Sequence, residues 1–278
     1  MMRRVTLPGG ETVPAVGLGT WRMGDSKAAR SAEAAVVRAA LDRGMTLIDT
    51  AEMYGEGGAE ESVGEGLAGR RKDAFIVSKV YPHNAGRKDA IAACERSLRR
   101  LRVDTIDLYL LHWRGSVPLA QTVEAFEELK AKGRIRYWGV SNFDVSDMEE
   151  LLAVANGGNC AANQVLYHLG SRGIEYDLVP WSQRHGIPIM AYSPLGVGRI
   201  LSDPALAGVA KRHGVEPATV AVAWSIRSGI VISIPKTAKI DRLAGLAAGG
   251  DLVLTAEDLA TLDKAFPPPR QKQPLASS

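Results

Sequence analysis

The sequence has few of the residues that mark disulfide-rich, metal-binding or membrane proteins. It contains only two cysteines, Cys94 and Cys160, in 278 residues, and neither has the neighbours of a metal site. We interpret both as buried thiols. No apolar run approaches the ~18 residues that span a bilayer, and the N-terminal arginines are not followed by the apolar segment of a signal peptide. These absences predict a cytoplasmic protein without metal.

A strong charge of either sign is also lacking. The formal net charge is +3, and lysine and arginine alternate with aspartate and glutamate along the chain. Without a basic tract, nucleic acid is not an expected partner. A composition of 46% hydrophobic and 23% charged residues fits a globular domain. No linker divides the chain, so we expect a single domain over 1–278, with an extended or partly disordered tail after the prolines, about 267–278.

Short apolar runs do recur regularly along the chain. The segment RRVTLPGGETVP first predicts an N-terminal β-hairpin around Pro8, Gly9 and Gly10. Eight runs with the length of strands follow it. They are Ala15–Leu18, Thr46–Ile48, Ala74–Val77, Thr105–Leu111, Ile135–Val140, Ala162–Leu166, Ile187–Ala191 and Val231–Ile234.

Segments with helical spacing separate these runs. Two of them carry the spacing of a capping box, with Ser146 three residues before Glu149 and Thr255 three residues before Asp258. The expected helices are Ala28–Asp42, Glu60–Ala68, Lys88–Leu101, Leu119–Ala131, Ser146–Ala155, Asp177–His185, Pro217–Ser228, Ile240–Ala248 and Thr255–Ala265.

Eight strand–helix units predict an α/β fold of the (β/α)8 TIM-barrel type, with the hairpin at its start and an additional C-terminal helix. An open doubly wound sheet is the competing architecture. Its glycine fingerprint, G-x-G-x-x-G, is not evident, because the glycines of GLGTWRMG have a different spacing.

Four polar residues stand at or just beyond the ends of three of these runs. They are Asp49, Tyr54, Lys79 and His112. The carboxyl ends of parallel strands meet at one mouth of a barrel, so we expect these side chains to lie close together. An ammonium near a phenol lowers its pKa from about 10. The set is therefore suited to donating a proton to a developing alkoxide, although each residue alone is more often structural.

The segments that carry these four residues, together with the rest of the chain, resemble the aldo-keto reductases. The matching motifs occur in the family's order and cover almost the whole chain: GLGTW, LIDTAEMYG, IVSKV, DLYLLHW, GRIRYWGVSNF, NQVLYH, AYSPLG and IPKT. The resemblance implies a barrel that reduces aldehydes and ketones with NADPH and without metal. It also implies that Tyr54 donates the proton, that Lys79 and Asp49 tune it, and that His112 orients the carbonyl.

The resemblance also implies a binding site for NADPH/NADP+. Its nicotinamide end is assigned to Ser141, Asn142, Gln164 and the stacking Tyr192. The pyrophosphate is assigned to Ser193, Leu195 and Gly196, and the 2′-phosphate to Lys236, Thr237 and Arg242. The chain departs from the family where many members have Glu-Asn and this sequence has Gly245-Leu246. We expect NADPH to remain preferred, with a weaker hold on the adenine.

Four residues are candidates for the substrate wall: Trp21, Trp113, Met53 and Tyr81. The loops after His112 and at Gly196–Ser202 are short, which predicts a shallow, open site and broad specificity. The resemblance is greatest to bacterial members that reduce methylglyoxal and related dicarbonyls. We expect a monomer. Two alternatives remain, namely a barrel that binds NADPH without catalysis, and an isomerase or hydrolase that does not use nicotinamide.

Overall fold

Two short strands near the N-terminus form the predicted hairpin. The computed structural model describes residues 1–277, and in it β1 (Arg4–Thr6) pairs antiparallel with β2 (Thr12–Pro14). Glu11 in the hairpin forms an ion pair with Arg136, close to the N-terminal end of a barrel strand. The hairpin therefore lies at the end of the barrel opposite to the mouth at which the strands finish.

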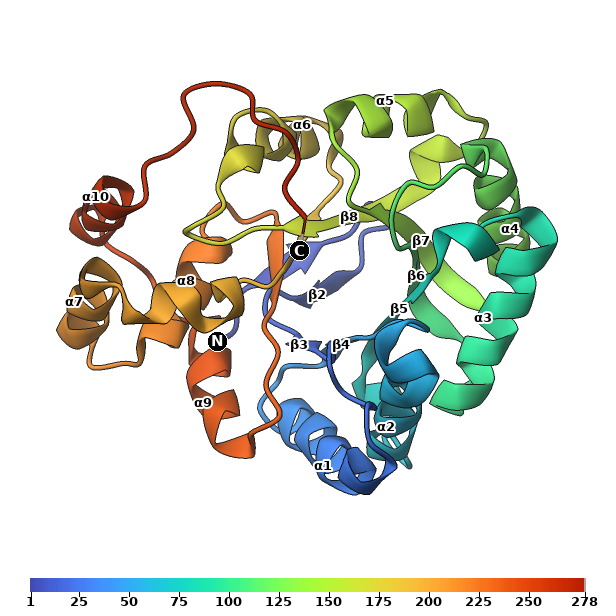
Figure 1. Ribbon diagram of the computed structural model, residues 1–278, viewed down its shortest axis with the longest axis horizontal. Coiled ribbons are helices and arrows are strands. Elements are labelled where there is room, and N and C mark those ends of the chain that lie inside the picture. Colours follow the sequence, from blue (N-terminus) through green and yellow to red (C-terminus); the bar gives the residue numbers. More distant parts are fainter. Residues whose placement is uncertain (278) are drawn as a thin grey trace.

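Eight parallel strands form a barrel, which confirms the predicted fold (Figure 1). Its strands are β3 (Leu18–Gly19), β4 (Leu47–Asp49), β5 (Phe75–Val80), β6 (Ile106–Leu111), β7 (Ile135–Ser141), β8 (Cys160–Leu166), β9 (Ile189–Tyr192) and β10 (Val231–Ile234). Parallel bridges join Val16 to Ser233 and Gly19 to Lys236, and so connect the first strand to the last. A Cβ at Gly19 would lie 2.8 Å from the carbonyl oxygen of Ile234, so glycine permits this close approach.

The central strands are buried on both faces, as expected where helices surround a parallel sheet. Every residue of β5 and of β6 is buried. Several of their polar side chains are paired, namely those of Ser78, Lys79 and Asp107. Asp107, for example, receives hydrogen bonds from Arg71, Arg136 and the backbone N–H of Ile76. The barrel is thus rigid at the level from which the mouth residues project.

Helices follow the strands around the outside of the barrel (Figure 1). They are α1 (Arg30–Leu41), α2 (Gly58–Gly66), α3 (Arg87–Leu101), α4 (Leu119–Ala131), α5 (Val145–Ala153), α6 (Leu178–His185), α7 (Pro204–His213), α8 (Pro217–Ser225), α9 (Ile240–Ala248) and α10 (Ala256–Ala265). The additional C-terminal helix is α10, and its Thr255–Asp258 capping box is present as predicted. Within the described residues, none of these helices is both long and apolar enough to cross a membrane.

One sequence-based prediction about helices was wrong, and one helix was missed. The N-cap of α5 is Asp144, which forms a capping box with Asp147, and not Ser146 with Glu149. The helix α7 was not predicted at all, although Asp203 caps it and Pro204 occupies its first turn. The prediction of two buried thiols is confirmed, because Cys94 and Cys160 are both buried and unpaired.

The chain after α10 returns across the mouth of the barrel (Figure 1). Lys272 forms ion pairs with Asp144 at the start of α5 and with Asp177 before α6. Five residues later, Ser277 lines the cavity at the mouth. The tail therefore forms part of the wall of that cavity.

Candidate active site

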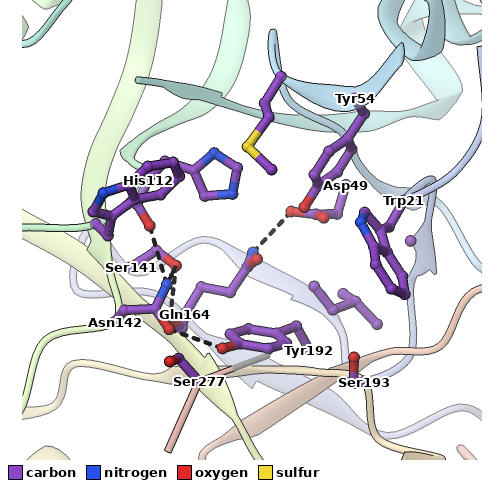
Figure 2. Close-up of a pocket in the computed structure, with 14 residues that line it drawn as sticks. Trp21, Asp49, Tyr54, His112, Ser141, Asn142, Gln164, Tyr192, Ser193 and Ser277 are labelled. Carbon is purple, nitrogen blue, oxygen red and sulfur yellow. Dashed lines mark hydrogen bonds between the residues drawn. The ribbon is translucent and has the colours of Figure 1, made fainter. Parts of the chain in front are cut away.

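A cavity of about 460 Å³ opens at the carboxyl ends of the barrel strands (Figure 2). This is the position at which barrel enzymes hold their active sites. The cavity is lined by Gly19, Trp21, Asp49, Met53, Tyr54, His112, Trp113, Ser141, Asn142, Gln164, Tyr192, Ser193, Ile234 and Ser277. Many of the residues predicted from the sequence are therefore brought together here.

The loop that carries Tyr54 packs closely against the loop after β3, since a Cβ at Gly55 would lie 2.6 Å from the backbone carbonyl carbon of Gly24. Gly24 has a φ of +80°, and a Cβ there would lie 2.1 Å from the backbone nitrogen of Ala59 at the start of α2. The buried carboxylate of Glu33 on α1 accepts hydrogen bonds from the Gly24 N–H and from Ser62 on α2. This loop and both helices are thus locked together, so Tyr54 has a defined position at the rim.

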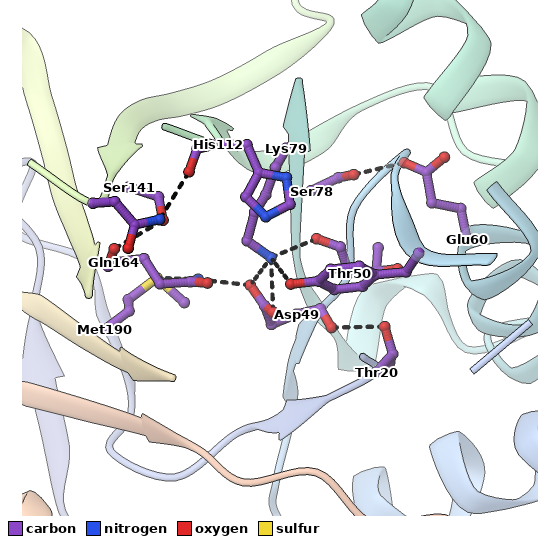
Figure 3. A network of polar contacts seen from close by, with 12 residues as sticks. Thr20, Asp49, Thr50, Glu60, Ser78, Lys79, His112, Ser141, Gln164 and Met190 are labelled. Carbon is purple, nitrogen blue, oxygen red and sulfur yellow. Dashed lines mark hydrogen bonds and ion pairs between the residues drawn. The ribbon is translucent and has the colours of Figure 1, made fainter. Parts of the chain in front are cut away.

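Lys79 contacts both Asp49 and Tyr54 of the predicted proton-donating group (Figure 3). Its Nζ atom lies 2.9 Å from Asp49 Oδ2, 2.8 Å from the Thr50 carbonyl oxygen and 3.2 Å from the Tyr54 hydroxyl oxygen. The Lys79 side chain is 0% exposed. Three groups from β4 and the loop after it therefore meet around the buried ammonium that β5 provides, as the strand ends predicted.

The electrostatic effect on Tyr54 differs in direction from the expected one. Burial raises the pKa of the Tyr54 hydroxyl, Lys79 lowers it and Asp49 raises it, and the net direction is upward. Burial acts to lower the pKa of Lys79, but Asp49 and then Tyr54 raise it and outweigh burial. The ammonium therefore stays charged and the phenol stays protonated near neutral pH, so Tyr54 holds the proton that it would donate.

His112 is a neutral imidazole at the opposite side of this group. Burial, assisted by the charge of Lys79, lowers its pKa to about 3. Its ring meets the Tyr54 ring edge-on, with 5.8 Å between the ring centroids. Nδ1 is buried without a hydrogen-bond partner among the described residues. Because an unpaired buried N–H costs more than an unpaired acceptor, we expect the proton on Nε2, where it can be donated to a ligand.

A chain of hydrogen bonds runs along the opposite wall of the cavity (Figure 2). The Tyr192 hydroxyl donates to Asn142 Oδ1 at 2.9 Å, and Asn142 Nδ2 donates to the His112 carbonyl oxygen at 3.1 Å. Ser141 donates to the carbonyl oxygen of Gln164, whose side chain reaches Asp49. Asn142 has a φ of +58°, a strained conformation that is typical of functional sites. These four polar residues are thus held in one arrangement.

The residues predicted for the rest of the cofactor lie along β9, β10 and the turns after them. Leu195 has φ −98° and ψ 9° and is followed by Gly196 with φ +55°, a sequence of conformations that forms anion-binding concavities in the backbone. Thr237 is buried, and Lys236 is half-buried. Arg242 is exposed on the first turn of α9. None of Lys236, Thr237 and Arg242 lines the cavity itself.

The position that departs from the family pattern is now explained by packing. Leu246 is 3% exposed and belongs to the core beneath α9. Gly245 faces α8, where its carbonyl oxygen accepts a hydrogen bond from Thr219. Leu246 has no polar side-chain atom, so hydrogen bonds to an adenine at this helix would have to come from other residues.

Aromatic and apolar groups form the outer wall. Trp21, Met53 and Trp113 line the cavity, as predicted, whereas Tyr81 is not among the lining residues. Tyr81 instead packs edge-on against Trp113, with 6.0 Å between the ring centroids. Sequence reasoning did not identify Ser277 as a lining residue, because nothing in the local sequence says where the tail ends in space. Within residues 1–277, no cluster of acidic, histidine or cysteine side chains could hold a metal ion.

The barrel and the polar group at its mouth place this chain among the (β/α)8-barrel enzymes. The profile described as "Aldo/keto reductase family" matches residues 15–266, and the chain belongs to this family. It is 51% identical over 278 residues to methylglyoxal reductase YeaE of Escherichia coli, covering 98% of both chains. It is 36% identical to the glyoxal reductase of Bacillus subtilis over 93% of this chain and 91% of the relative.

Solved structures agree with the sequence comparison. An aldo/keto reductase from Klebsiella pneumoniae in complex with NADP and acetate is 50% identical and superposes with a TM-score of 0.97, covering 100% of both chains. The aldo-keto reductase Tm1743 in complex with epalrestat is 36% identical, with a TM-score of 0.90, covering 95% of this chain and 99% of that chain. The family and the barrel fold are therefore established for this chain.

Proposed function

We propose that the protein reduces small aldehydes and dicarbonyls such as methylglyoxal to alcohols, and that it uses NADPH as the reductant. The reverse of this reaction oxidises the CH–OH group of the alcohol, with NADP+ as the acceptor. The single observation that carries the proposal is the buried Lys79 ammonium, held by Asp49 and lying 3.2 Å from the Tyr54 hydroxyl oxygen at the cavity mouth.

The residues of the cavity support a specific division of roles. When bound, the reduced nicotinamide supplies a hydride to the carbonyl carbon. The Tyr54 hydroxyl gives its proton to the carbonyl oxygen, and the Tyr54 phenolate that remains is stabilised by Lys79 until water restores the proton. The neutral His112 donates a hydrogen bond from Nε2 to the same oxygen and so orients the carbonyl. Atoms and charge then balance, because one hydride and one proton convert a carbonyl to an alcohol.

The polar wall is suited to holding the nicotinamide. Ser141, Asn142 and Gln164 present hydroxyl and amide groups into the cavity beside the aromatic ring of Tyr192. A planar ring stacked on Tyr192 would thus present one face to the substrate, while the amide groups hold its carboxamide. The turn at Leu195 and Gly196 is suited to the pyrophosphate, and Lys236, Thr237 and Arg242 are assigned to the 2′-phosphate of NADPH.

The outer wall supports small and flat substrates. Trp21, Met53 and Trp113 offer apolar and aromatic surface, and Trp113 is 38% exposed, so the cavity is open on that side. The relatives support the same substrate class, since they are a methylglyoxal reductase and a glyoxal reductase. We also propose that the protein acts as a monomer in the cytoplasm without a nucleic-acid partner, which is consistent with its two free thiols and its small net charge.

The test is a carbonyl panel with NADPH consumption as the readout. We expect the wild type to oxidise NADPH with methylglyoxal and small aldehydes, and Tyr54→Phe to lose at least about a hundredfold in kcat, the lower end of what a positioned acid contributes. NADPH binding, followed by fluorescence, should be unchanged in Tyr54→Phe, because the phenyl ring is retained. Full activity of Tyr54→Phe would refute the role of the hydroxyl, and a wild type active only on bulky ketones would refute the substrate class.

A further inference from the structure

A hydrogen bond crosses the barrel between the wall assigned to nicotinamide and the group assigned to proton donation. Gln164 lies on β8 and Asp49 at the end of β4, four strands apart in a barrel of eight, so the two strands face each other. The Gln164 Nε2 atom is 2.8 Å from Asp49 Oδ1, although 115 positions separate the residues in sequence. Figure 3 shows the side chain of Gln164 directed across the barrel towards Asp49.

The chemistry of the pair fixes which way the amide points. An ionised carboxylate only accepts hydrogen bonds, so Gln164 must present its NH2 group to Asp49. Both residues are almost fully buried, with exposed fractions of 1% for Gln164 and 2% for Asp49. Since Gln164 also lines the cavity, its carbonyl oxygen Oε1 is the amide atom left to accept from a ligand. The residue is thus an acceptor towards the cavity and a donor towards Asp49.

The Asp49 carboxylate in turn faces both Gln164 and Lys79, and its Oδ1 atom is shared between the two donors. Lys79 Nζ lies 2.9 Å from the carboxylate and also donates to the Tyr54 hydroxyl. The groups that act electrostatically on Tyr54 are Lys79 on β5, Asp49 on β4 and Tyr192 on β9, and the neutral His112 ring faces it from the end of β6. Asp49 is the carboxylate of this set, so a stronger donor to Asp49 makes the surroundings more favourable to a phenolate.

We propose that Gln164 is a positioning residue that couples occupation of the nicotinamide subsite to the acidity of Tyr54. A carboxamide N–H that donates to Oε1 polarises the amide, and a polarised amide is a stronger donor at Nε2. The bond to Asp49 then tightens, less of the carboxylate's charge acts on Tyr54, and the phenol gives up its proton more readily. This goes beyond a contact to the cofactor, and it rests on the proposed function because a nicotinamide carboxamide is the group that donates to Oε1.

The first test measures protons instead of turnover. NADPH is titrated by calorimetry into the wild type at about pH 10–11, at and above the ordinary pKa of tyrosine because burial raises the pKa of Tyr54, in two buffers of different ionisation enthalpy. We expect the wild type to release protons on binding. Gln164→Met keeps the length of the side chain but removes the amide, and should release less than about half as many. Equal release by the wild type and Gln164→Met would overturn the coupling, as would no release by the wild type.

The second test uses Gln164→Glu, which has nearly the same shape, with Gln183→Glu on the exposed face of α6 as the matched control. Two carboxyls in contact cannot both ionise easily, so the introduced group holds a proton at low pH and loses it as the pH rises. We expect the single-turnover rate with saturating NADPH to fall at least about tenfold between pH 6 and pH 9, the range in which such raised carboxyls titrate. The wild type and Gln183→Glu should lack this fall.

The outcomes separate the coupling from a simple contact to the cofactor and from the proposed function. If Gln164 only contacts the cofactor, Gln164→Glu still accepts from the carboxamide and keeps the wild-type pH profile, which would overturn the proposal. If the wild type binds NADPH and releases protons but reduces no carbonyl, the proposed function fails while the coupling stands. Should Gln164→Met not fold, as judged by circular dichroism, the nearly isosteric Gln164→Glu replaces it in the calorimetric test. Unchanged proton release by that variant at about pH 10–11 would equally overturn the coupling.

Discussion

Replacing Lys79 by methionine tests the physical centre of the site. The ammonium is 0% exposed and Asp49 is 3% exposed by side chain, so the substitution leaves a buried carboxylate without its cation. Removing one partner of a buried ion pair costs about 3–5 kcal/mol. The Thr50 carbonyl oxygen loses its donor as well. In a domain of this size each kcal/mol shifts Tm by about 2–4 °C, so we expect a fall of about 10 °C.

The charge of Asp49 is the reason for this cost, and a second substitution can remove it. In Lys79→Met/Asp49→Asn no charge is left unpaired, so we expect the double variant to recover to within about 2 kcal/mol of the wild type. The matched control is Lys132→Met. It removes an exposed ammonium that pairs with Glu128 one helical turn away, and it should leave Tm nearly unchanged.

The assay is thermal and denaturant unfolding, both followed by circular dichroism, combined with the rate of carbonyl reduction. Both the single and the double variant should lose at least about a hundredfold in kcat, because Tyr54 no longer has a cation to stabilise its phenolate. A Lys79→Met protein as stable as the wild type, or a double variant no more stable than the single one, would refute the reasoning from burial and charge. Retention of kcat would refute the role assigned to the ammonium.

Three further outcomes follow from the same geometry. The pKa of His112 is lowered from 6.5 to about 3, so the contribution of its neutral form to stability is complete above pH 6.5. As the pH falls from 6.5 towards 3, the free energy of unfolding should decrease by about 1.4 kcal/mol per pH unit. His112→Gln should show a smaller acid dependence in urea unfolding. Lys272→Ala should change stability by less than about 1 kcal/mol, since the side chain is 43% exposed. It should nevertheless raise KM for small aldehydes, because the tail loses its ion pairs, and an unchanged KM would contradict this. Lys236→Ala should weaken NADPH more than NADH in fluorescence titrations, and equal binding of both cofactors by the wild type would remove the 2′-phosphate assignment.

The meeting of the mouth residues could be predicted from the sequence for a simple geometric reason. Asp49 and Lys79 end or nearly end parallel strands, so their side chains had to converge once the strands were in register. The bond between Gln164 and Asp49 could not be predicted in the same way. It depends on the closure of the barrel, which brings β8 opposite β4, and strand ends alone do not give the direction of a long amide side chain.

The missed details of the helices have a different cause. The segment before α5 contains two overlapping capping-box patterns, Asp144 with Asp147 and Ser146 with Glu149. The structure uses the first, and this frame buries Met148 and Leu151 against the barrel. Local capping chemistry could not decide between the two frames, whereas the packing of the apolar face does.

The upward direction of the pKa of Tyr54 shows why burial must be known before a site is interpreted. Proximity to Lys79 could be expected from the strands, but the cost of burying a phenolate is a property of the closed cavity. The two effects suit opposite moments of the reaction. Burial keeps the proton on Tyr54 before substrate arrives, so the donor is loaded near neutral pH. Lys79 would act once charge develops on the Tyr54 oxygen as its proton leaves, and because the ammonium is fully buried and 3.2 Å away this attraction is stronger than it would be at the surface. In the proposed mechanism, the protonated form of Tyr54 that burial maintains near neutral pH is therefore the form that carbonyl reduction requires.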